Sequence, residues 1–218
     1  MRTLGILMLQ TRFPRPPGDI GHPASFDFPV RCRVVQGASP QRVVRDADPA
    51  LLQPFIDAAR ALVEEGAAAI ATSCGFLARW QRELQSALPV PVWTSSLLQL
   101  AELQPLRCGV ITIDAASLDP ALLQAVGADP ATPVEGITPG CALHRTLLQD
   151  LPRLDADDAQ AQVLAAGERL LARRPDLQVL VLECTNLPPY AAALHRATGL
   201  PVHDVRTLLH RRMAQLSG

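Results

Sequence analysis

Five cysteines carry the most reactive side chains of this sequence: Cys32, Cys74, Cys108, Cys141 and Cys184. A cysteine thiolate can act as a base or as a nucleophile. The number is odd and no CxxC pair occurs, which excludes a zinc knuckle and a thioredoxin-type motif. A free cysteine is most often a small buried hydrophobic residue, and we interpret Cys32, Cys108 and Cys141 in this way. The sequence around the other two indicates chemistry.

Cys74 and Cys184 each follow a predicted buried strand, at 67–73 and 177–183, and each precedes a predicted helix. Ligands of open α/β sheets bind beyond the carboxyl ends of the strands. The N-terminus of a helix attracts anions and lowers the pKa of a thiol from about 8.5. Two thiols that face each other can remove a proton from one side of a carbon beside a carboxylate and return one to the other side.

The elements that position these thiols alternate between strands and helices, which indicates a parallel α/β fold. Apolar runs predict strands at 3–9, 28–35, 67–73, 89–93, 108–113, 177–183 and 200–203. Helical periodicity predicts helices at 49–65, 77–88, 95–103, 115–126, within 137–151, and at 155–173, 189–197 and 205–216.

The two halves of the chain repeat the same landmarks in the same order. Gly5 matches Gly109, Cys74 matches Cys184 and Leu88-Pro89 matches Leu200-Pro201, at offsets of 104, 110 and 112 residues. A period this long indicates two related lobes and not a solenoid. We therefore expect two pseudo-symmetric lobes, residues 1–95 with 205–218 and residues 96–204, each a mostly parallel sheet flanked by helices. The active site is expected in the cleft between them.

Composition excludes several classes of function. The chain has no lysine, which excludes a pyridoxal Schiff base and a Walker-type nucleotide site. The net charge of −1 and the absence of a long apolar run indicate no nucleic-acid partner and no membrane partner. No set of residues has metal-ligand spacing, so we expect no metal and no cofactor. We also expect a cytoplasmic protein whose partner is a small carboxylate substrate.

The segments ATSCGF (71–76) and LECTNLPP (182–189), together with the opening GILML strand, resemble the aspartate/glutamate racemase superfamily. That superfamily includes hydantoin racemases, arylmalonate decarboxylases and maleate isomerases. The resemblance spans essentially the whole chain and implies the two-lobed fold and the catalytic pair Cys74 and Cys184. The sequence departs from the family where Gly75 and Phe76 stand in place of Asn and Thr, and where Asn186 replaces His or Glu.

Residues next to each cysteine are the expected donors to the substrate carboxylate, namely Thr72, Ser73, Gly75, Phe76, Thr185 and Asn186. The resemblance also implies that the loop after the first strand reaches the substrate through Thr11 and Arg12, with Arg15 and His22 behind them. Thr112 and Ser117 end the strand that mirrors the first one and face the same cleft, unless they only cap the next helix. Strand alternation predicts that Glu183 points away from the cleft.

The leading functional hypothesis is a cofactor-independent racemase or epimerase of an amino acid, aspartate-like or glutamate-like, or of a related small carboxylate. The alternatives are a decarboxylase or a cis–trans isomerase of the same fold, or a carboxylate-binding protein without turnover. Leucine-rich stripes on 155–173 and 205–216 are core faces or a dimer surface, so a homodimer stays open.

Overall fold

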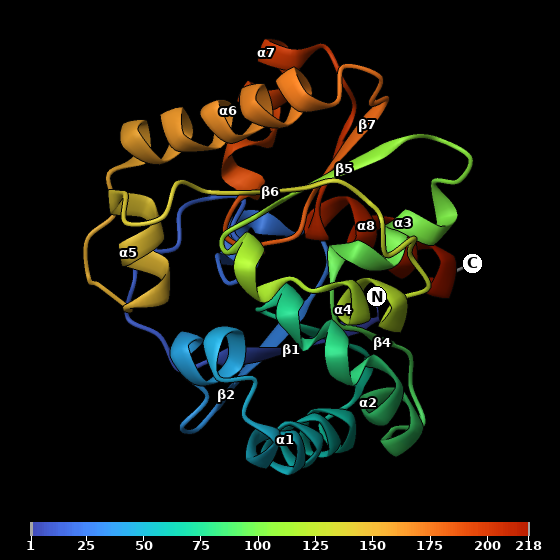
Figure 1. Ribbon diagram of the computed structural model, residues 1–218. Coiled ribbons are helices and arrows are strands. Elements are labelled where there is room, and N and C mark those ends of the chain that lie inside the picture. The colour runs from blue at the N-terminus through green and yellow to red at the C-terminus, as the bar shows by residue number, and fades with distance from the viewer. Residues whose placement is uncertain (1, 218) are drawn as a thin grey trace.

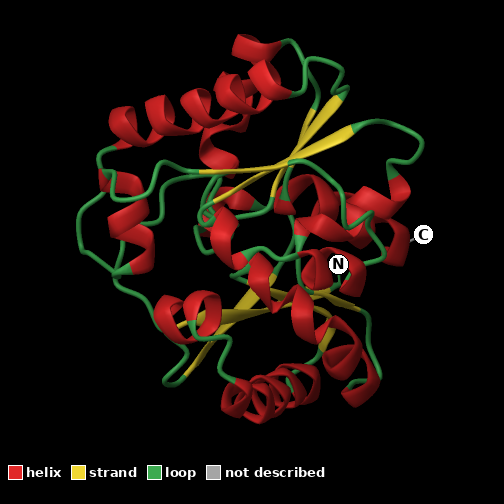
Figure 2. Cartoon of the chain, viewed as in Figure 1, coloured by secondary structure: helices red, strands yellow, loops and turns green. Residues whose placement is uncertain are grey.

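The computed structural model describes residues 2–217, which form two four-stranded parallel sheets (Figures 1 and 2). The first sheet has the order β2-β1-β3-β4, formed by Val30–Val35, Thr3–Leu9, Ala67–Thr72 and Val92–Trp93. The second has the order β6-β5-β7-β8, formed by Val134–Gly136, Cys108–Thr112, Val179–Leu182 and Val202–His203. The two-lobed α/β fold predicted from the sequence is confirmed.

The lobes repeat each other in detail as well as in strand order. The strand β1 lies between β2 and β3, and β5 lies between β6 and β7 in the same way. Just beyond β3, the N–H of Ser73 donates to the carbonyl of Leu7 at 2.9 Å. At the equivalent place beyond β7, the N–H of Glu183 donates to the carbonyl of Ile111 at 2.9 Å. The residues before the two cysteines therefore leave their sheets in the same manner.

Helices cover the outer face of each sheet (Figure 1). Helices α1 (Leu52–Glu64) and α2 (Gln81–Ala87) lie against the first sheet, and α6 (Ala156–Arg173) and α7 (Ala191–Thr198) lie against the second. The carboxylate of Asp155 caps α6 by accepting from two backbone N–H groups of its first turn. The buried face of α6 is small and apolar, with Ala159, Val163, Ala166, Gly167 and Leu170.

The chain crosses between the lobes twice, and each crossing covers the remaining face of a sheet. Helix α8 (Val205–Ser217) buries Leu208, Leu209 and Met213 in a core shared with β1 and β3 of the first lobe. In the other direction, the segment that leads into α3 (Gln99–Glu102) reaches the second lobe, where the hydroxyl of Ser96 donates to the carbonyl of Leu182 at 2.6 Å. The exact domain boundaries stay a prediction.

Several elements are shorter than their apolar patterns predicted. The segment after Cys74 begins as a 3-10 helix at Gly75–Trp80 before α2 follows. Helix α4 begins at Pro120 and runs to Ala125, because Asp119 caps it and Pro120 suits the first position. Helix α5 covers Ala142–Leu148. The short strand β6 was not predicted, since three residues carry too little pattern.

Within residues 2–217, no helix combines the length and the apolar character needed to cross a membrane.

Candidate active site

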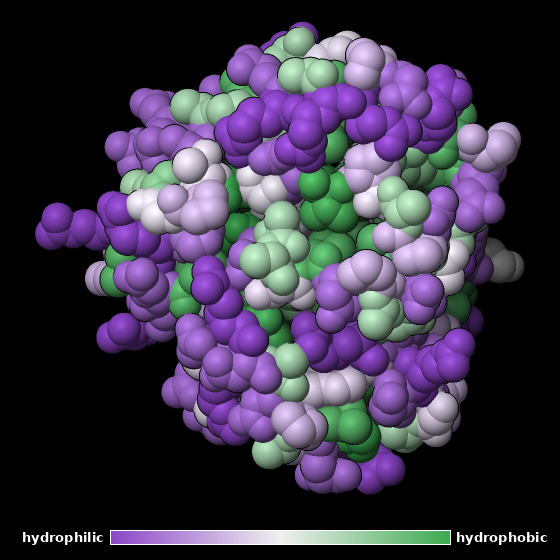
Figure 3. All heavy atoms as spheres, viewed as in Figure 1, coloured by the Kyte–Doolittle hydropathy of each residue, from purple (hydrophilic) through white to green (hydrophobic). Residues whose placement is uncertain are grey.

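Cys74 and Cys184 line the same small cavity between the lobes. The cavity has a volume of about 30 Å³, which is room for little more than a water molecule. Its walls are mostly apolar and come from both lobes, with Leu9, Phe13, Pro40 and Val44 on one side and Ile113, Leu147 and Leu148 on the other. Figure 3 shows hydrophobic residues gathered between the two lobes and hydrophilic residues over their outer ends. The side chains that line the cavity leave no room for a substrate in this conformation.

The two thiols have matching surroundings. A backbone hydrogen bond from Phe76 lowers the pKa of Cys74, and one from Asn186 lowers the pKa of Cys184. Burial raises both pKa values, and this effect is larger than that of the hydrogen bonds. Burial and, second, the charge of Glu183 raise the pKa of Cys74 to about 12 and that of Cys184 well above its ordinary value. Both cysteines are therefore neutral thiols at neutral pH.

Glu183 is the acidic residue of the cavity, and sequence reasoning placed it wrongly. It lines the cavity and is fully buried. Strand alternation does not apply to it because β7 ends at Leu182, one residue earlier. Its Oε2 accepts a hydrogen bond of 2.6 Å from the hydroxyl of Thr112. Its Oε1 is buried and has no hydrogen-bond partner among the residues described. Burial raises the pKa of Glu183 to about 7.

Gly75 makes room for this carboxyl. A Cβ atom at position 75 would lie 2.2 Å from Oε1 of Glu183 and 2.6 Å from its carbonyl oxygen. The backbone at position 75 therefore approaches Glu183 more closely than any residue with a Cβ atom would allow. At the equivalent position of the other lobe, Thr185 has a side chain, and its hydroxyl donates to the carbonyl of Ser73 at 2.6 Å. The two halves of the site are thus alike in backbone and different in side chains.

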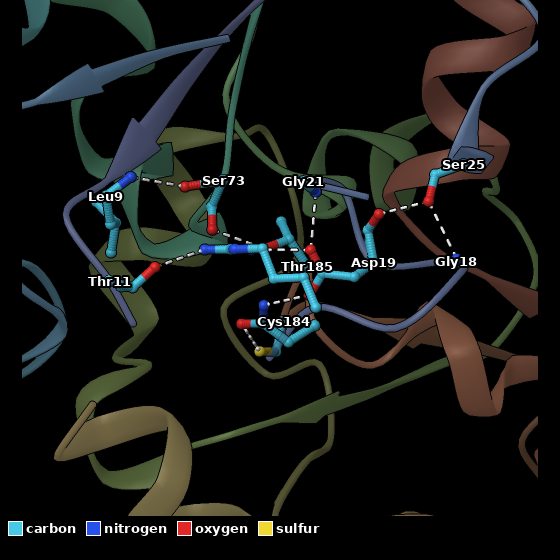
Figure 4. Close-up of polar contacts among 11 residues, drawn as sticks. Leu9, Thr11, Gly18, Asp19, Gly21, Ser25, Ser73, Cys184 and Thr185 are labelled. Atoms are coloured by element: carbon cyan, nitrogen blue, oxygen red, sulfur yellow. Dashed lines mark hydrogen bonds and ion pairs between the residues drawn. The ribbon is translucent and has the colours of Figure 1, made fainter. Parts of the chain in front are cut away.

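Side chains of the loop that follows β1 form hydrogen bonds with the segment that contains Cys184 (Figure 4). The carboxylate of Asp19, which is 1% exposed, accepts from the side-chain amide of Asn186 at 2.6 Å and from Arg15 at 2.8 Å. Arg15 also donates to the hydroxyl of Thr11 at 3.0 Å. Asn186 also contacts the thiol, because Sγ of Cys184 donates to its Oδ1 at 3.5 Å. Sequence reasoning missed Asp19, because an acidic residue in a Pro/Gly-rich loop has no distinctive pattern.

Five of the six predicted donors beside the cysteines line the cavity: Ser73, Gly75, Phe76, Thr185 and Asn186. The sixth, Thr72, lies outside the lining, and its hydroxyl donates to the carbonyls of Cys74 and Thr94. Two hydroxyls of the lining already take part in structural hydrogen bonds. The Oγ of Ser73 accepts from the N–H of Leu9 at 2.9 Å, and Thr185 is bound to Ser73 across the lobes. Phe76 is 1% exposed and forms part of the apolar wall. Their roles toward a substrate stay predictions.

The remaining predicted site residues lie outside this lining. The side chain of Arg12 is 76% exposed and pairs with Asp150 of the other lobe at 3.2 Å. The hydroxyl of Thr11 accepts from Arg15 at 3.0 Å, and the hydroxyl of Ser117 donates to Asp114 at 2.8 Å. Thr112 contacts the cavity only through Glu183.

Two ion pairs join the lobes beside the cavity. One is Arg12 with Asp150, and the other is Arg45 of the first lobe with Asp114 of the second, at 2.7 Å. Both arginines are substantially exposed, so each pair contributes little to stability. The lobes are also joined by buried hydrogen bonds, such as the one from the hydroxyl of Thr185 to the carbonyl of Ser73, and by a shared apolar core.

Solved structures of the same architecture belong to one superfamily. Unliganded arylmalonate decarboxylase matches with a TM-score of 0.65 and 18% identity, covering 100% of this chain and 93% of that one. An aspartate racemase homologue from Pyrococcus horikoshii matches with a TM-score of 0.58 and 15% identity, covering 99% of each chain. Glutamate racemase from Thermus thermophilus matches with a TM-score of 0.53 and 20% identity, covering 97% and 79%. These structures show the fold of the aspartate/glutamate racemase superfamily.

Comparison of sequences identifies a more specific family than the comparison of structures does. No protein-family model matches the chain. Dimethylsulfoniopropionate lyase 7 of Emiliania huxleyi is 31% identical, covering 98% of this chain and 67% of the relative. Dimethylsulfoniopropionate lyase 3 of the same organism is 30% identical, covering 98% and 60%. The dimethylsulfoniopropionate lyase of Durusdinium is 28% identical, covering 93% and 71%. The chain spans about three fifths to seven tenths of the length of these relatives. It belongs to the dimethylsulfoniopropionate lyase family, on the fold of the aspartate/glutamate racemase superfamily.

Proposed function

We propose that this protein is a cofactor-independent lyase that removes the proton beside the carboxylate of a short onium acid, of which dimethylsulfoniopropionate is the first candidate. A cysteine thiolate takes the α-proton, a carbon–carbon double bond forms, and a neutral thioether leaves from the β-carbon. The products are an unsaturated carboxylate and dimethyl sulfide. The relatives named for this reaction support the proposal.

The observation that carries the proposal is the charge of the cavity wall. No arginine or histidine side chain is among the described residues that line the cavity, whereas one carboxyl, that of Glu183, does line it. A dicarboxylate such as aspartate or glutamate would bring a second negative charge into this wall without a counter-ion, at a large desolvation cost. A substrate with one carboxylate and one cationic group matches the wall better.

The raised thiol pKa values support the same choice. In the empty site, burial and the charge of Glu183 hold Cys74 and Cys184 in the neutral form. A positive charge within a few ångströms lowers the pKa of a thiol. An onium substrate brings such a charge with it, so that thiolate formation follows substrate binding. The apolar walls around Phe13 and Phe76 also suit the methyl groups of a sulfonium ion.

Racemisation remains the second candidate, because both cysteines are present at equivalent positions in one cavity. A two-base racemase needs both, whereas an elimination needs one base. The test is a panel of dimethylsulfoniopropionate, D- and L-aspartate and D- and L-glutamate in deuterated water, followed by proton NMR. We expect acrylate and dimethyl sulfide from the onium acid and no α-proton exchange in the amino acids. Exchange in an amino acid without elimination of the onium acid would favour the racemase and refute the lyase.

A further inference from the structure

The two thiols differ in one hydrogen bond, although the backbone around them is alike. Sγ of Cys184 donates to Oδ1 of Asn186 at 3.5 Å. Phe76 stands at the equivalent place, two residues after Cys74, and its side chain carries no oxygen or nitrogen that could accept. Among the residues described, the thiol of Cys74 therefore has no side-chain acceptor. An acceptor stabilises a thiol and not a thiolate, because only the thiol has a proton to donate.

The orientation of the Asn186 amide is set by Asp19. Nδ2 of Asn186 donates to Oδ2 of Asp19 at 2.6 Å, so the oxygen of the amide is the atom that faces the thiol. The other carboxylate oxygen, Oδ1, accepts from Arg15 at 2.8 Å and from the N–H of Gly21 at 2.7 Å (Figure 4). A carboxylate only accepts hydrogen bonds. The amide therefore cannot turn over while Asp19 is charged.

The charges of the same loop act differently on the two thiols. The negative charge of Asp19 raises the pKa of Cys184. The positive charge of Arg15, together with that of Arg79, lowers the pKa of Cys74. The ion pair between Arg15 and Asp19 therefore favours a proton on Cys184 and a negative charge on Cys74.

We propose that Asp19, acting through Asn186, is a positioning residue that keeps Cys184 a neutral thiol and leaves Cys74 as the base of the site. Glu183 raises the pKa of both thiols and does not distinguish them. The role of Cys74 rests on the proposed elimination, in which its thiolate takes the α-proton and later releases that proton to water. Cys184 keeps its own proton throughout. A chain with two equivalent cysteines is thereby suited to a reaction that needs one base.

Asp19→Asn tests this orientation because it keeps the shape of the side chain. The two donors at Oδ1, Arg15 and the N–H of Gly21, hold the oxygen of the new amide at that place. Its NH₂ group then faces Asn186, whose own amide must turn over to accept from it. This turn brings Nδ2 of Asn186 to Sγ of Cys184 in place of Oδ1. A donor at this position favours the thiolate.

The measurement is alkylation of each cysteine by the neutral reagent iodoacetamide, from about pH 7 to about pH 10, followed by peptide mass spectrometry. It needs no substrate. Cys74 and Cys184 are 8% and 7% exposed, so access of the reagent does not favour either thiol. In wild type we expect Cys74 to react faster than Cys184 at every pH. In Asp19→Asn the rate of Cys184 relative to Cys74 rises roughly tenfold, as expected for a fall of about one unit in the pKa of Cys184.

Two controls separate the orientation of the amide from other effects of the substitution. In an Asn186→Leu background no amide remains to turn over, so Asp19→Asn changes the relative rate by less than about threefold. Asp119→Asn replaces a carboxylate that caps α4 in the second lobe, and it leaves the relative rate unchanged.

Three results overturn the proposal: a wild-type Cys184 that reacts as fast as Cys74, an unchanged relative rate in Asp19→Asn, and an equal effect of Asp19→Asn in both backgrounds. The first of these needs no variant, so it holds even where a substitution impairs folding. Failure of the lyase assay with the expected alkylation pattern refutes the proposed function alone.

Discussion

A methyl group added at Gly75 is expected to damage both the stability and the activity of the protein. The new Cβ atom would lie 2.2 Å from Oε1 and 2.6 Å from the carbonyl oxygen of Glu183, below the 3.0 Å that real Cβ atoms keep. Relief requires about 0.8 Å of movement at the carboxyl and about 0.4 Å at the backbone. The backbone contact cannot be relieved by rotation of a side chain, so the two cysteine segments must move apart.

The expected magnitude follows from this displacement. Overpacking of a buried contact costs about 1–3 kcal/mol, which lowers the Tm of a chain of this size by roughly 2–12 °C. A shift approaching 1 Å beside the reacting groups lowers kcat/KM by roughly 10²-fold. Thermal unfolding and the elimination assay measure the two effects on the same Gly75→Ala preparation.

Gly109→Ala is the matched control. Its Cβ would meet methyl ends of leucine side chains, those of Leu177 at 2.6 Å, Leu170 at 2.9 Å and Leu180 at 3.5 Å, and it lies in β5 outside the lining of the cavity. We expect a loss of stability with little change in kcat/KM. A Gly75→Ala protein with the Tm and kcat/KM of wild type would refute the close contact between Gly75 and Glu183.

Three other predictions concern charged groups. Because burial holds the pKa of Glu183 at about 7, above its usual 4.5, its contribution to stability is present below about pH 4.5 and is lost as pH rises to 7. Urea unfolding should show that the free energy of unfolding of wild type, relative to that of Glu183→Gln, falls by about 3 kcal/mol over that range. A pH-independent difference between the two proteins would contradict this prediction. Asp19→Ala leaves Arg15 and Asn186 without their carboxylate and should cost about 3–5 kcal/mol in the same assay, against almost none for the exposed Asp27→Ala. Arg12→Ala, at an exposed ion pair, should change stability by less than about 1 kcal/mol and leave KM within roughly twofold. A large rise in KM would instead support the contact between Arg12 and the substrate that the sequence suggested.

Much of the fold was predictable because its buried strands coincide with apolar runs of the sequence. The strand Thr3–Leu9 was predicted with the bounds it has, and the duplication correctly predicted that the two sheets share one topology. Elements whose ends depend on caps, such as α4 at Asp119 and Pro120, were predicted only roughly. The three residues of β6 were missed because they are too few to show a period.

The site was less predictable than the fold, because its geometry depends on contacts between distant segments. The sequence indicated Cys74 and Cys184, and both line one cavity. It placed Glu183 on the wrong side, since the contact of that residue with Gly75 exists only where the two lobes meet. Asp19 was missed for the same reason, because its partner Asn186 is 167 residues away. Hydrogen bonds over such separations leave no local pattern in a single sequence.

The most direct test of the account is the elimination of dimethylsulfoniopropionate by wild type, Cys74→Ser, Cys184→Ser and Cys141→Ser, with acrylate and dimethyl sulfide measured. A serine hydroxyl is far less acidic than a thiol, so it cannot supply the base at neutral pH. We predict that Cys74→Ser loses at least roughly 10³-fold in kcat/KM while keeping the wild-type Tm, and that Cys141→Ser stays active. Full activity in both Cys74→Ser and Cys184→Ser would contradict thiol chemistry in this cavity.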